Sequence, residues 1–313
     1  MKKYFIISLI FIAHFTSAYS FRKLTILTDV MAPRTGPFFV RQSLISGLSL
    51  LDIPFNINPP SDQVGDAVAV ISGVKNLRTA IQWKASGKIS CLVGGPNIMN
   101  SPKEFNYLFA QKELDACLVP SYWIQIAYEE DAPSLKGRIR LWFSGIDTDY
   151  WKPTQSNKAK VLVYWKTEPE FFCKQVESLL HQYGYETIRV RYGSYTQETY
   201  RNILNQSQFA VFITRSESQG IALAEAWAMD VPTLNFDPGS LTYRGKVYSI
   251  VSSCPYLSED TGKTWKEIGE LEALLQNYKA ISQSFNAREW MLKNMTNQAS
   301  ALQLISIIDD VLK

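Results

Sequence analysis

FITRSESQGIALAEAWAMDVPTL, residues 212–234, is the most informative stretch of this sequence. It reads as a strand, a loop, a helix and a second strand, because an apolar run precedes a polar turn and a helical apolar pattern. Glu217 lies in the loop and Glu225 in the helix, with seven residues between them, and Gly220 allows a tight turn into the helix. A helix that begins near Gln219 puts Glu225 roughly 9 Å further along its axis. The two carboxylates are therefore expected to serve different parts of one extended ligand.

The start of that helix can also bind an anion. The first N–H groups of a helix have no intrahelical acceptor and lie at the positive end of its dipole, so the amides of Gln219, Gly220 and Ile221 can hold a diphosphate. A carboxylate on the helix can accept hydrogen bonds from ribose hydroxyls, and one just before it can reach sugar hydroxyls. These features together predict a nucleotide-sugar site. The alternative from spacing alone is that Glu217 caps the helix and Glu225 is a solvated helix residue.

Outward from this segment, the chain alternates short apolar runs with helical patterns, which is typical of βαβ units and a parallel sheet. Strands are expected at 23–30, 64–73, 88–97, 114–121, 158–166, 185–193, 209–216 and 231–237. Helices are expected at 40–51, 76–87, 122–130, 169–184, 196–206 and about 220–229. The sequence thus predicts an α/β fold of two Rossmann-like domains, with a ligand in the interdomain cleft at the carboxyl ends of the strands.

A turn-forming stretch, SGIDTDYWKP (144–153), separates the two runs of alternation. It has no regular apolar period and closes with a proline, which cannot continue a strand ladder. The expected organisation is a signal peptide, an acceptor-side first domain, a nucleotide-sugar-binding second domain and a helical C-terminal segment. Their expected bounds are 1–20, 21–150, 151–285 and 286–313.

The first twenty residues read as a secretory signal, with Lys2 and Lys3 before an apolar run, 5–15, and then small residues. The run is shorter than the roughly 20 residues that span a bilayer, and no later stretch is long and uncharged enough to do so. Cleavage predicts an exported or periplasmic protein without a transmembrane span. The alternatives are an uncleaved membrane anchor, or a cytoplasmic protein whose start codon is misassigned.

The composition excludes several classes of protein. The 313 residues are 46% hydrophobic and 19% charged, too long for one compact core and too apolar for disorder. The formal charge of +3 falls to about +1 without residues 1–20, which hold two lysines and no acids. A nearly neutral chain has no strong electrostatic reason to bind nucleic acid.

The numbers of histidines and cysteines further limit the kinds of metal and nucleophilic sites that the chain can form. The sequence has two histidines, His14 in the leader and His181, so it lacks a His-rich metal site. A Ser-His-Asp or Cys-His nucleophile could use only His181, which is expected on the surface near a helix end. The four cysteines show neither CxxC spacing nor a dense disulfide framework. This favours four unpaired, mostly buried thiols over one long-range bridge.

Three phrases, taken in order, resemble the retaining glycosyltransferases of the GT-B fold, particularly the family 4-like group called glycosyl transferases group 1. The family's motif ES-G-AL-EA-A-GVPT is similar to ESQGIALAEA (217–226) followed by VPT (231–233). GIDTDYWKP (145–153) resembles the interdomain phrase. NAREWMLKN (286–294) resembles the closing segment, whose helix crosses back to the first domain. The likeness is strong from about residue 140 onward and weaker from 21 to 140.

The resemblance implies a role for each residue of the motif. Glu225 would hold the ribose of the donor, and Glu217 would contact the transferred sugar near the reacting carbon. The residues that begin the helix would line the sugar and the phosphate: Ser218, Gln219, Gly220 and Ile221.

Two further donor contacts follow from the resemblance by position. Lys166 ends the strand expected at 158–166, where the family places basic residues against the diphosphate; the alternative is an ordinary solvated lysine. Gly36 follows the first strand, where the family keeps glycines near the phosphates; a plain turn glycine is an equal alternative. Helix amides and Lys166 would replace a metal ion, so neither a metal nor another cofactor is expected.

The predicted function is transfer of a sugar from a nucleoside-diphosphate donor to a hydroxyl acceptor on a glycan, lipid or protein, with retention and without metal, as in glycan biosynthesis. Residues 21–180 hold no histidine, which the family uses against the donor sugar, and Tyr164-Trp165-Lys166 replaces its usual Gly-Arg. A noncatalytic protein of the same fold is therefore one alternative. The other is an extracytoplasmic, two-lobed solute-binding protein, which would share the leader and the paired lobes.

Overall fold

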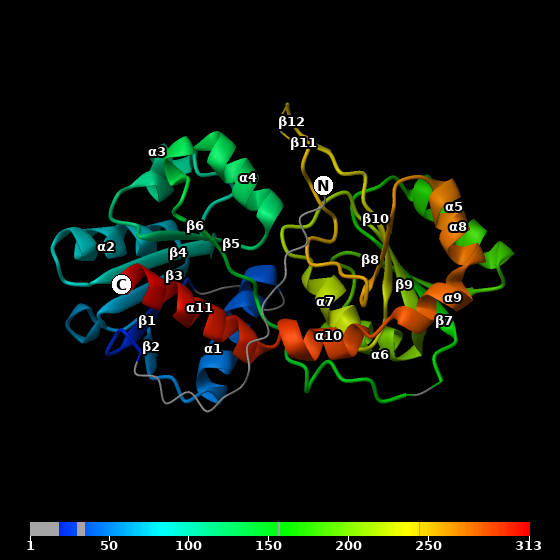
Figure 1. Ribbon diagram of the computed structural model, residues 1–313, viewed down its shortest axis with the longest axis horizontal. Coiled ribbons are helices and arrows are strands. Elements are labelled where there is room, and N and C mark those ends of the chain that lie inside the picture. Colours follow the sequence, from blue (N-terminus) through cyan, green and yellow to red (C-terminus); the bar gives the residue numbers. More distant parts are fainter. Residues whose placement is uncertain (1–18, 30–34, 156, 244) are drawn as a thin grey trace.

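Residues 19–29, 35–155, 157–243 and 245–313 are described by a computed structural model, in which two α/β domains lie side by side (Figure 1). Most of the predicted signal peptide lies outside these residues. Its last two positions are described: the Ser20 N–H donates to Asp309 Oδ1 (2.9 Å), and the Tyr19 ring stacks on Phe21. No helix among the described residues is long and apolar enough to cross a membrane.

The first domain is built on a six-stranded sheet in the order β2-β1-β3-β4-β5-β6, with all neighbours parallel. Its strands are β1 (Leu24–Leu27), β2 (Phe55–Ile57), β3 (Ala67–Ser72), β4 (Cys91–Asn97), β5 (Ala116–Val119) and β6 (Ile139–Leu141). Its helices are α1 (Gly36–Leu50), α2 (Val74–Ala85), α3 (Glu104–Tyr107) and α4 (Tyr122–Asp131).

The second domain has a five-stranded parallel sheet in the order β13-β10-β9-β7-β8. Its strands are β7 (Lys160–Trp165), β8 (Glu186–Arg191), β9 (Ser207–Ile213), β10 (Thr233–Phe236) and β13 (Gly262–Trp265). Its helices are α5 (Glu170–Gln182), α6 (Gln197–Gln206), α7 (Ile221–Ala228), α8 (Ile268–Gln276) and α9 (Tyr278–Ile281). An antiparallel hairpin of β11 (Leu241–Tyr243) and β12 (Lys246–Tyr248) projects from it (Figure 1).

Both sheets are covered by helices on both faces, which explains their continuous apolar strands. In β3, Ala67, Ala69 and Ile71 pack with α1, while Val68 and Val70 pack with α2. This division follows from the alternation of side chains along a strand. In the second domain, α6 and α7 cover one face, and α5 and α8 cover the other. The prediction of two parallel α/β domains is confirmed.

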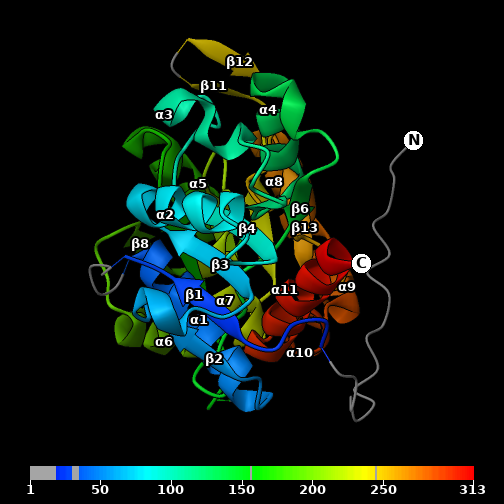
Figure 2. The same ribbon diagram turned by 90° about the vertical axis from the view of Figure 1, so that its left-hand side faces the viewer.

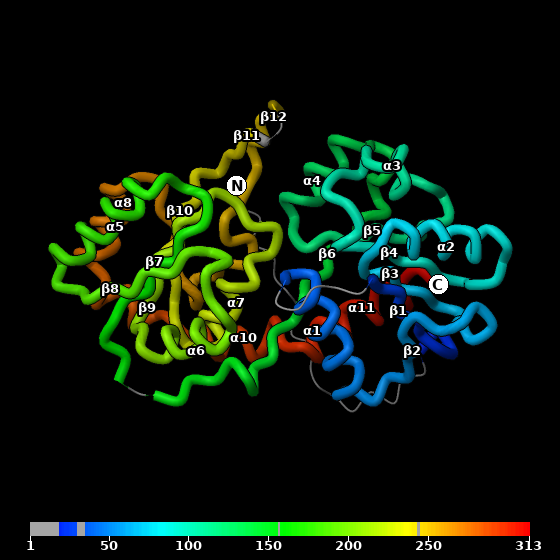
Figure 3. Tube along the Cα trace, turned by 180° about the vertical axis from the view of Figure 1, so that it is seen from behind, coloured from blue at the N-terminus to red at the C-terminus, as the bar shows by residue number. Residues whose placement is uncertain are grey.

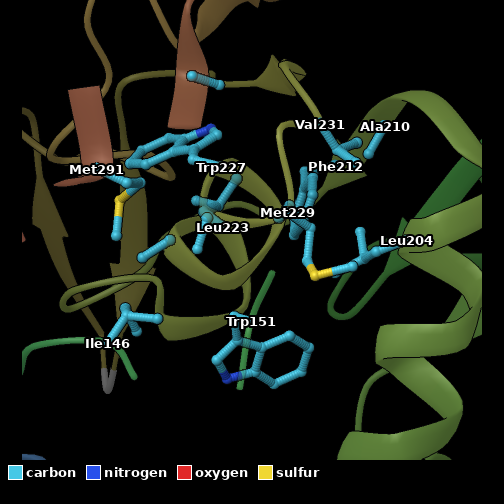
Figure 4. Packing of buried hydrophobic residues seen from close by; sticks show 14 of the residues in the cluster. Ile146, Trp151, Leu204, Ala210, Phe212, Leu223, Trp227, Met229, Val231 and Met291 are labelled. Carbon is cyan, nitrogen blue, oxygen red and sulfur yellow. The ribbon is translucent and has the colours of Figure 1, made fainter. Parts of the chain in front are cut away.

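The C-terminal segment passes from the second domain to the first. α10 (Ala287–Asn294) adds Met291 to the core around Trp227, which Figure 4 shows from close by. α11 (Asn297–Leu312) then packs against α1, as Figures 2 and 3 show. The approach is close, because a Cβ on Gly47 of α1 would lie 2.1 Å from the Asn297 carbonyl oxygen. The expected crossing helix is confirmed.

The linker between the domains runs beside this crossing. Ile146 forms a parallel bridge with Thr296, and its N–H donates to the Met295 carbonyl (2.9 Å). A Cβ on Gly145 would lie 2.4 Å from the Thr296 carbonyl oxygen, so the contact needs a glycine. The chain therefore crosses between the domains at two adjoining places.

The expectations for cysteine and histidine are also confirmed. All four cysteines are free and buried: Cys91, Cys117, Cys173 and Cys254. His181 is exposed on α5, where its Nε2 lies 3.0 Å from Thr187 Oγ1.

Candidate functional site

The loop between β9 and α7 carries Glu217, whose backbone is held from both sides. The Glu217 N–H donates to the Ser252 carbonyl (3.0 Å), and the Glu217 carbonyl accepts from Trp123 Nε1 (2.8 Å). Ser252 belongs to the second domain, whereas Trp123 lies in the first turn of α4 in the first domain. The loop is therefore fixed where the two domains meet.

The side chain of Glu217 forms an ion pair with Lys166. Lys166 Nζ lies 2.7 Å from Oε1 and 2.9 Å from Oε2, and Thr214 Oγ1 lies 3.4 Å from Oε1. The residues meet because β7 and β9 are parallel neighbours, so their carboxyl ends adjoin. The side chains of Lys166 and Glu217 are 24% and 16% exposed to solvent. Burial raises the pKa of Glu217, and the Lys166 charge and hydrogen bond oppose that shift.

Two residues near this pair were not predicted from the sequence. The Tyr192 ring centroid lies 4.5 Å from Lys166 Nζ, in a cation–π contact. Tyr192 follows β8, the strand beside β7, and this position at a strand end is the signal that could have found it. Arg215 is next to Thr214 but binds Glu168 through two hydrogen bonds of 2.9 and 2.8 Å. Its charge is therefore already compensated, and Lys166 is the cation that faces Glu217.

α7 begins immediately after this loop. Gly220 caps it with a φ of +84°, a left-handed conformation that favours glycine, and an added Cβ would lie 2.8 Å from Leu223 Cδ1. Ser218 is exposed, whereas Ile221 packs against the cores of both domains. The start of α7 and its amides therefore lie at the domain junction, and the helix begins four residues after Glu217.

The Gln219 side chain has a structural role beside the one predicted for its amide. Its Oε1 accepts from the Ser144 N–H (2.8 Å), and its Nε2 donates to the Ser144 carbonyl (2.7 Å). These buried hydrogen bonds tie the start of α7 to the linker between the domains. They were missed because 75 residues separate the partners and no local spacing connects them.

Glu225 lies beside Gln197, the first residue of α6. Its side chain accepts a hydrogen bond from Gln197, and the residue is 6% exposed. Burial raises the pKa of Glu225 to about 8. Burial likewise raises the pKa values of Tyr195 and Tyr200, and the nearby Glu225 charge adds to the shift. The alternative of a solvated helix residue does not describe this environment.

Gly36 lies in the other domain, as the first residue of α1. It is exposed, and no described atom lies within 4 Å of where its Cβ would be. The packing therefore imposes no glycine there. Among the described residues, no group of three or more His, Cys, Asp or Glu side chains could hold a metal ion.

The junction brings complementary groups together. A lysine, a carboxylate and the amide end of a helix adjoin, and such a set can bind a phosphate group and hold a hydroxyl beside it. Glu225 lies one helical turn further along α7, where a carboxyl in its neutral form can both donate and accept a hydrogen bond. The sequence predicted these members, but it did not predict that Lys166 and Glu217 bind each other.

Comparison with known proteins supports the architecture. No protein-family model matches this chain, and no curated protein matches it in sequence. Among solved structures, Anabaena HepE in complex with UDP and glucose is 11% identical, with a TM-score of 0.58, over 92% of this chain and 99% of that one.

Two other solved structures are similar to the same extent. The lipopolysaccharide outer core galactosyltransferase WaaB in its apo form is 11% identical, with a TM-score of 0.56, over 92% of this chain and 99% of that one. Sucrose-phosphate synthase from Thermosynechococcus elongatus is 12% identical, with a TM-score of 0.56, over 90% of this chain and 97% of that one. At such identities the likeness establishes the fold. The chain therefore has the GT-B fold, two Rossmann-like domains joined by a linker and by a C-terminal helix that crosses back to the first domain.

Proposed function

We propose that this protein is a glycosyltransferase that takes a sugar from a nucleoside-diphosphate donor and passes it to a hydroxyl acceptor. One observation carries the proposal: Lys166 and Glu217 are paired beside the start of α7, at the junction of the two domains. The GT-B architecture supports it, since the solved structures reported above include a galactosyltransferase and a complex with UDP and glucose.

The pair suggests how donor binding would proceed. The diphosphate would replace Glu217 as the counterion of Lys166, and the freed carboxylate would accept hydrogen bonds from the sugar. Charge grows on the diphosphate as the bond to the sugar breaks, and Lys166 with the α7 amides would stabilise that charge. We propose retention of configuration at the transferred carbon, and catalysis without a metal ion, on the resemblance of the motif.

Glu225 would bind the ribose from its buried site. With a pKa of about 8, the carboxyl is mostly protonated at neutral pH. A neutral carboxyl can donate to one ribose hydroxyl and accept from the other, which suits a diol. The exposed Ser218 and the amides of Gln219 to Ile221 complete the proposed donor site.

The decisive test uses calorimetry and a transfer assay on the intact protein. We expect UDP, ADP or another nucleoside diphosphate to bind, and a radiolabelled sugar to reach a hydroxyl acceptor. Glu217→Ala should lower turnover by about 100-fold, the usual scale for a group that stabilises a transition state. Glu225→Ala should weaken donor binding by about 10- to 30-fold, the scale of two lost hydrogen bonds.

Glu289→Ala is the matched control, because Glu289 is an exposed carboxylate on α10 that pairs with Lys293. Unchanged donor affinity and turnover in both test variants would refute the assignment. Binding of free sugars without nucleotides would indicate a solute-binding protein. Nucleotide-sugar binding without transfer or hydrolysis would indicate a noncatalytic protein of this fold, and the anomeric configuration of the product tests retention.

We also propose that the protein is exported, with cleavage after Ala18 rather than after Ser20, where the expected signal peptide (1–20) ends. A cut there would leave Tyr19 and Ser20 in the mature chain, where both contact other described residues. Mass spectrometry of the protein from fractionated cells should therefore find Tyr19 as the first residue. A retained Met1 would point to an uncleaved membrane anchor, and a chain that begins at a later start codon would point to a cytoplasmic protein.

A further inference from the structure

α4 of the first domain is attached to the segment that carries Glu217. Trp123 Nε1 donates to the Glu217 carbonyl (2.8 Å), and the Glu217 N–H donates to the Ser252 carbonyl (3.0 Å). Four residues after Ser252, the hydroxyl of Tyr256 donates to the Pro120 carbonyl (2.5 Å), just before α4. These contacts close a ring that runs from α4 to Glu217, on to the loop 252–256, and back to α4.

The other end of α4 is also attached to the second domain. Lys246 of β12 lies 3.0 Å from Asp131 and 3.1 Å from Glu130. Asp131 is eight residues from Trp123, or about 12 Å along the helix axis. Between these ends, the cavity that separates α4 from residues 248–250 measures about 10 Å³, room for roughly one water molecule. We call this contact along α4 the seam.

The anchors of Glu217 divide unequally between the domains. Its N–H and its carboxylate bind Ser252, Lys166 and Thr214 of the second domain. Its carbonyl binds Trp123 of the first domain. A movement that separates the domains would therefore break one anchor and leave the rest in place.

We propose that Trp123 is a positioning residue that makes the placement of Glu217 depend on closure of the seam. The proposal rests on the proposed function, in which Glu217 contacts the sugar. A donor enters while the seam is open, and Trp123 fixes the Glu217 backbone when the seam closes. The proposed donor contacts of Lys166, Glu225 and the α7 amides belong to the second domain, so donor binding does not need Trp123.

The test is Trp123→Phe, which keeps an aromatic ring and removes the N–H donor. We expect turnover to fall about three- to tenfold, the scale of one neutral hydrogen bond, with donor affinity unchanged. Trp83→Phe is the matched control, since Trp83 is likewise a half-buried indole but lies on α2. Tyr256→Phe removes the hydrogen bond from the loop 252–256 to Pro120, which belongs to the same closed set of contacts. Its effect on turnover should therefore not add fully to that of Trp123→Phe.

Hydrogen exchange provides a readout that does not need activity. The amides of residues 216–220 should exchange faster in Trp123→Phe than in wild type or Trp83→Phe, because the anchor from the first domain is lost. Unchanged exchange there would overturn the positioning role even in an inactive protein. A donor affinity that falls in step with turnover would also overturn it. Failure of wild type to bind or transfer a nucleotide sugar would instead refute the proposed function.

Discussion

Glu217 has a lysine Nζ 2.7 Å from its carboxylate, whereas Glu225, eight residues further on, is buried against Gln197 among tyrosines. One segment thus carries two carboxyls in opposite electrostatic surroundings. Burial raises the pKa of both, but at Glu217 the Lys166 charge opposes the shift, while at Glu225 the pKa rises to about 8. Different environments can give one residue type two roles. Here the contrast suits a carboxyl paired with a cation for the sugar and a neutral carboxyl for the ribose.

Removal of Lys166 should have the largest effect on transfer, because it leaves Glu217 without its cation. Lys166→Ala should lower transfer by about 100-fold or more and the free energy of unfolding by about 2 kcal/mol, less than for a fully buried pair. Steady-state kinetics and urea unfolding measure the two effects. Lys174→Ala, at an exposed lysine of α5, is the control. A double variant, Lys166→Met with Glu217→Gln, should regain stability but not activity. If Lys166→Ala were as stable as the control, the ion pair would not compensate the buried charge of Glu217, and the contrast with Glu225 would be wrong.

The raised pKa of Glu225 predicts a pH-dependent stability. The folded protein holds this proton up to about pH 8, but the unfolded chain loses it near the ordinary value of 4.5, so burial of Glu225 destabilises the fold progressively between these values. From pH 5 to pH 8 the free energy of unfolding should fall by about 4 kcal/mol. Glu225→Gln keeps the shape of the neutral acid and should remove this slope. Urea unfolding at several pH values measures this pH dependence, with Glu289→Gln at an exposed position as the control. If the stability of the wild type changed with pH no more than that of Glu225→Gln, Glu225 would be ionised in the folded protein.

Gly220, which lies between the two carboxyls, should give the smallest effect. Gly220→Ala forces a Cβ into a left-handed conformation and toward Leu223, and should cost about 1–2 kcal/mol. Gly193→Ala is a matched control, with a φ of +80° and no described atom within 4 Å of the new Cβ. The excess loss at Gly220 in thermal unfolding measures the contact with Leu223. Equal losses would show that the backbone conformation alone requires the glycine.

The fold could be predicted because parallel strands buried on both faces read as continuous apolar runs, as AVAVIS does in β3. The strands that escaped prediction are short and lie at sheet edges or in the hairpin. β2 has three half-buried residues, and β13 (GKTW) is half polar. Such strands carry little periodic signal.

The candidate site was predictable as a set of residues but not as a set of contacts. Glu217, Gly220 and Glu225 belong to one short motif, so their spacing can be read directly from the sequence. The environment of Glu225 comes from Tyr195 and Gln197, which precede it by 30 and 28 positions. Trp123 lies 94 residues from the carbonyl that it binds. Contacts of such range depend on the packing of whole domains and leave no local pattern.

The adjoining crossings at Gly145 and Thr296 define how the halves can move. Because these two covalent connections contact each other, they act together as one hinge. Rotation of the domains about this hinge disturbs the fewest contacts. Displacement grows with the lever arm, and the β11–β12 hairpin lies at the opposite end of the molecule from α10 (Figure 1). A few degrees of rotation at the hinge would therefore separate Lys246 from Asp131 well before it strained the core between α1 and α11.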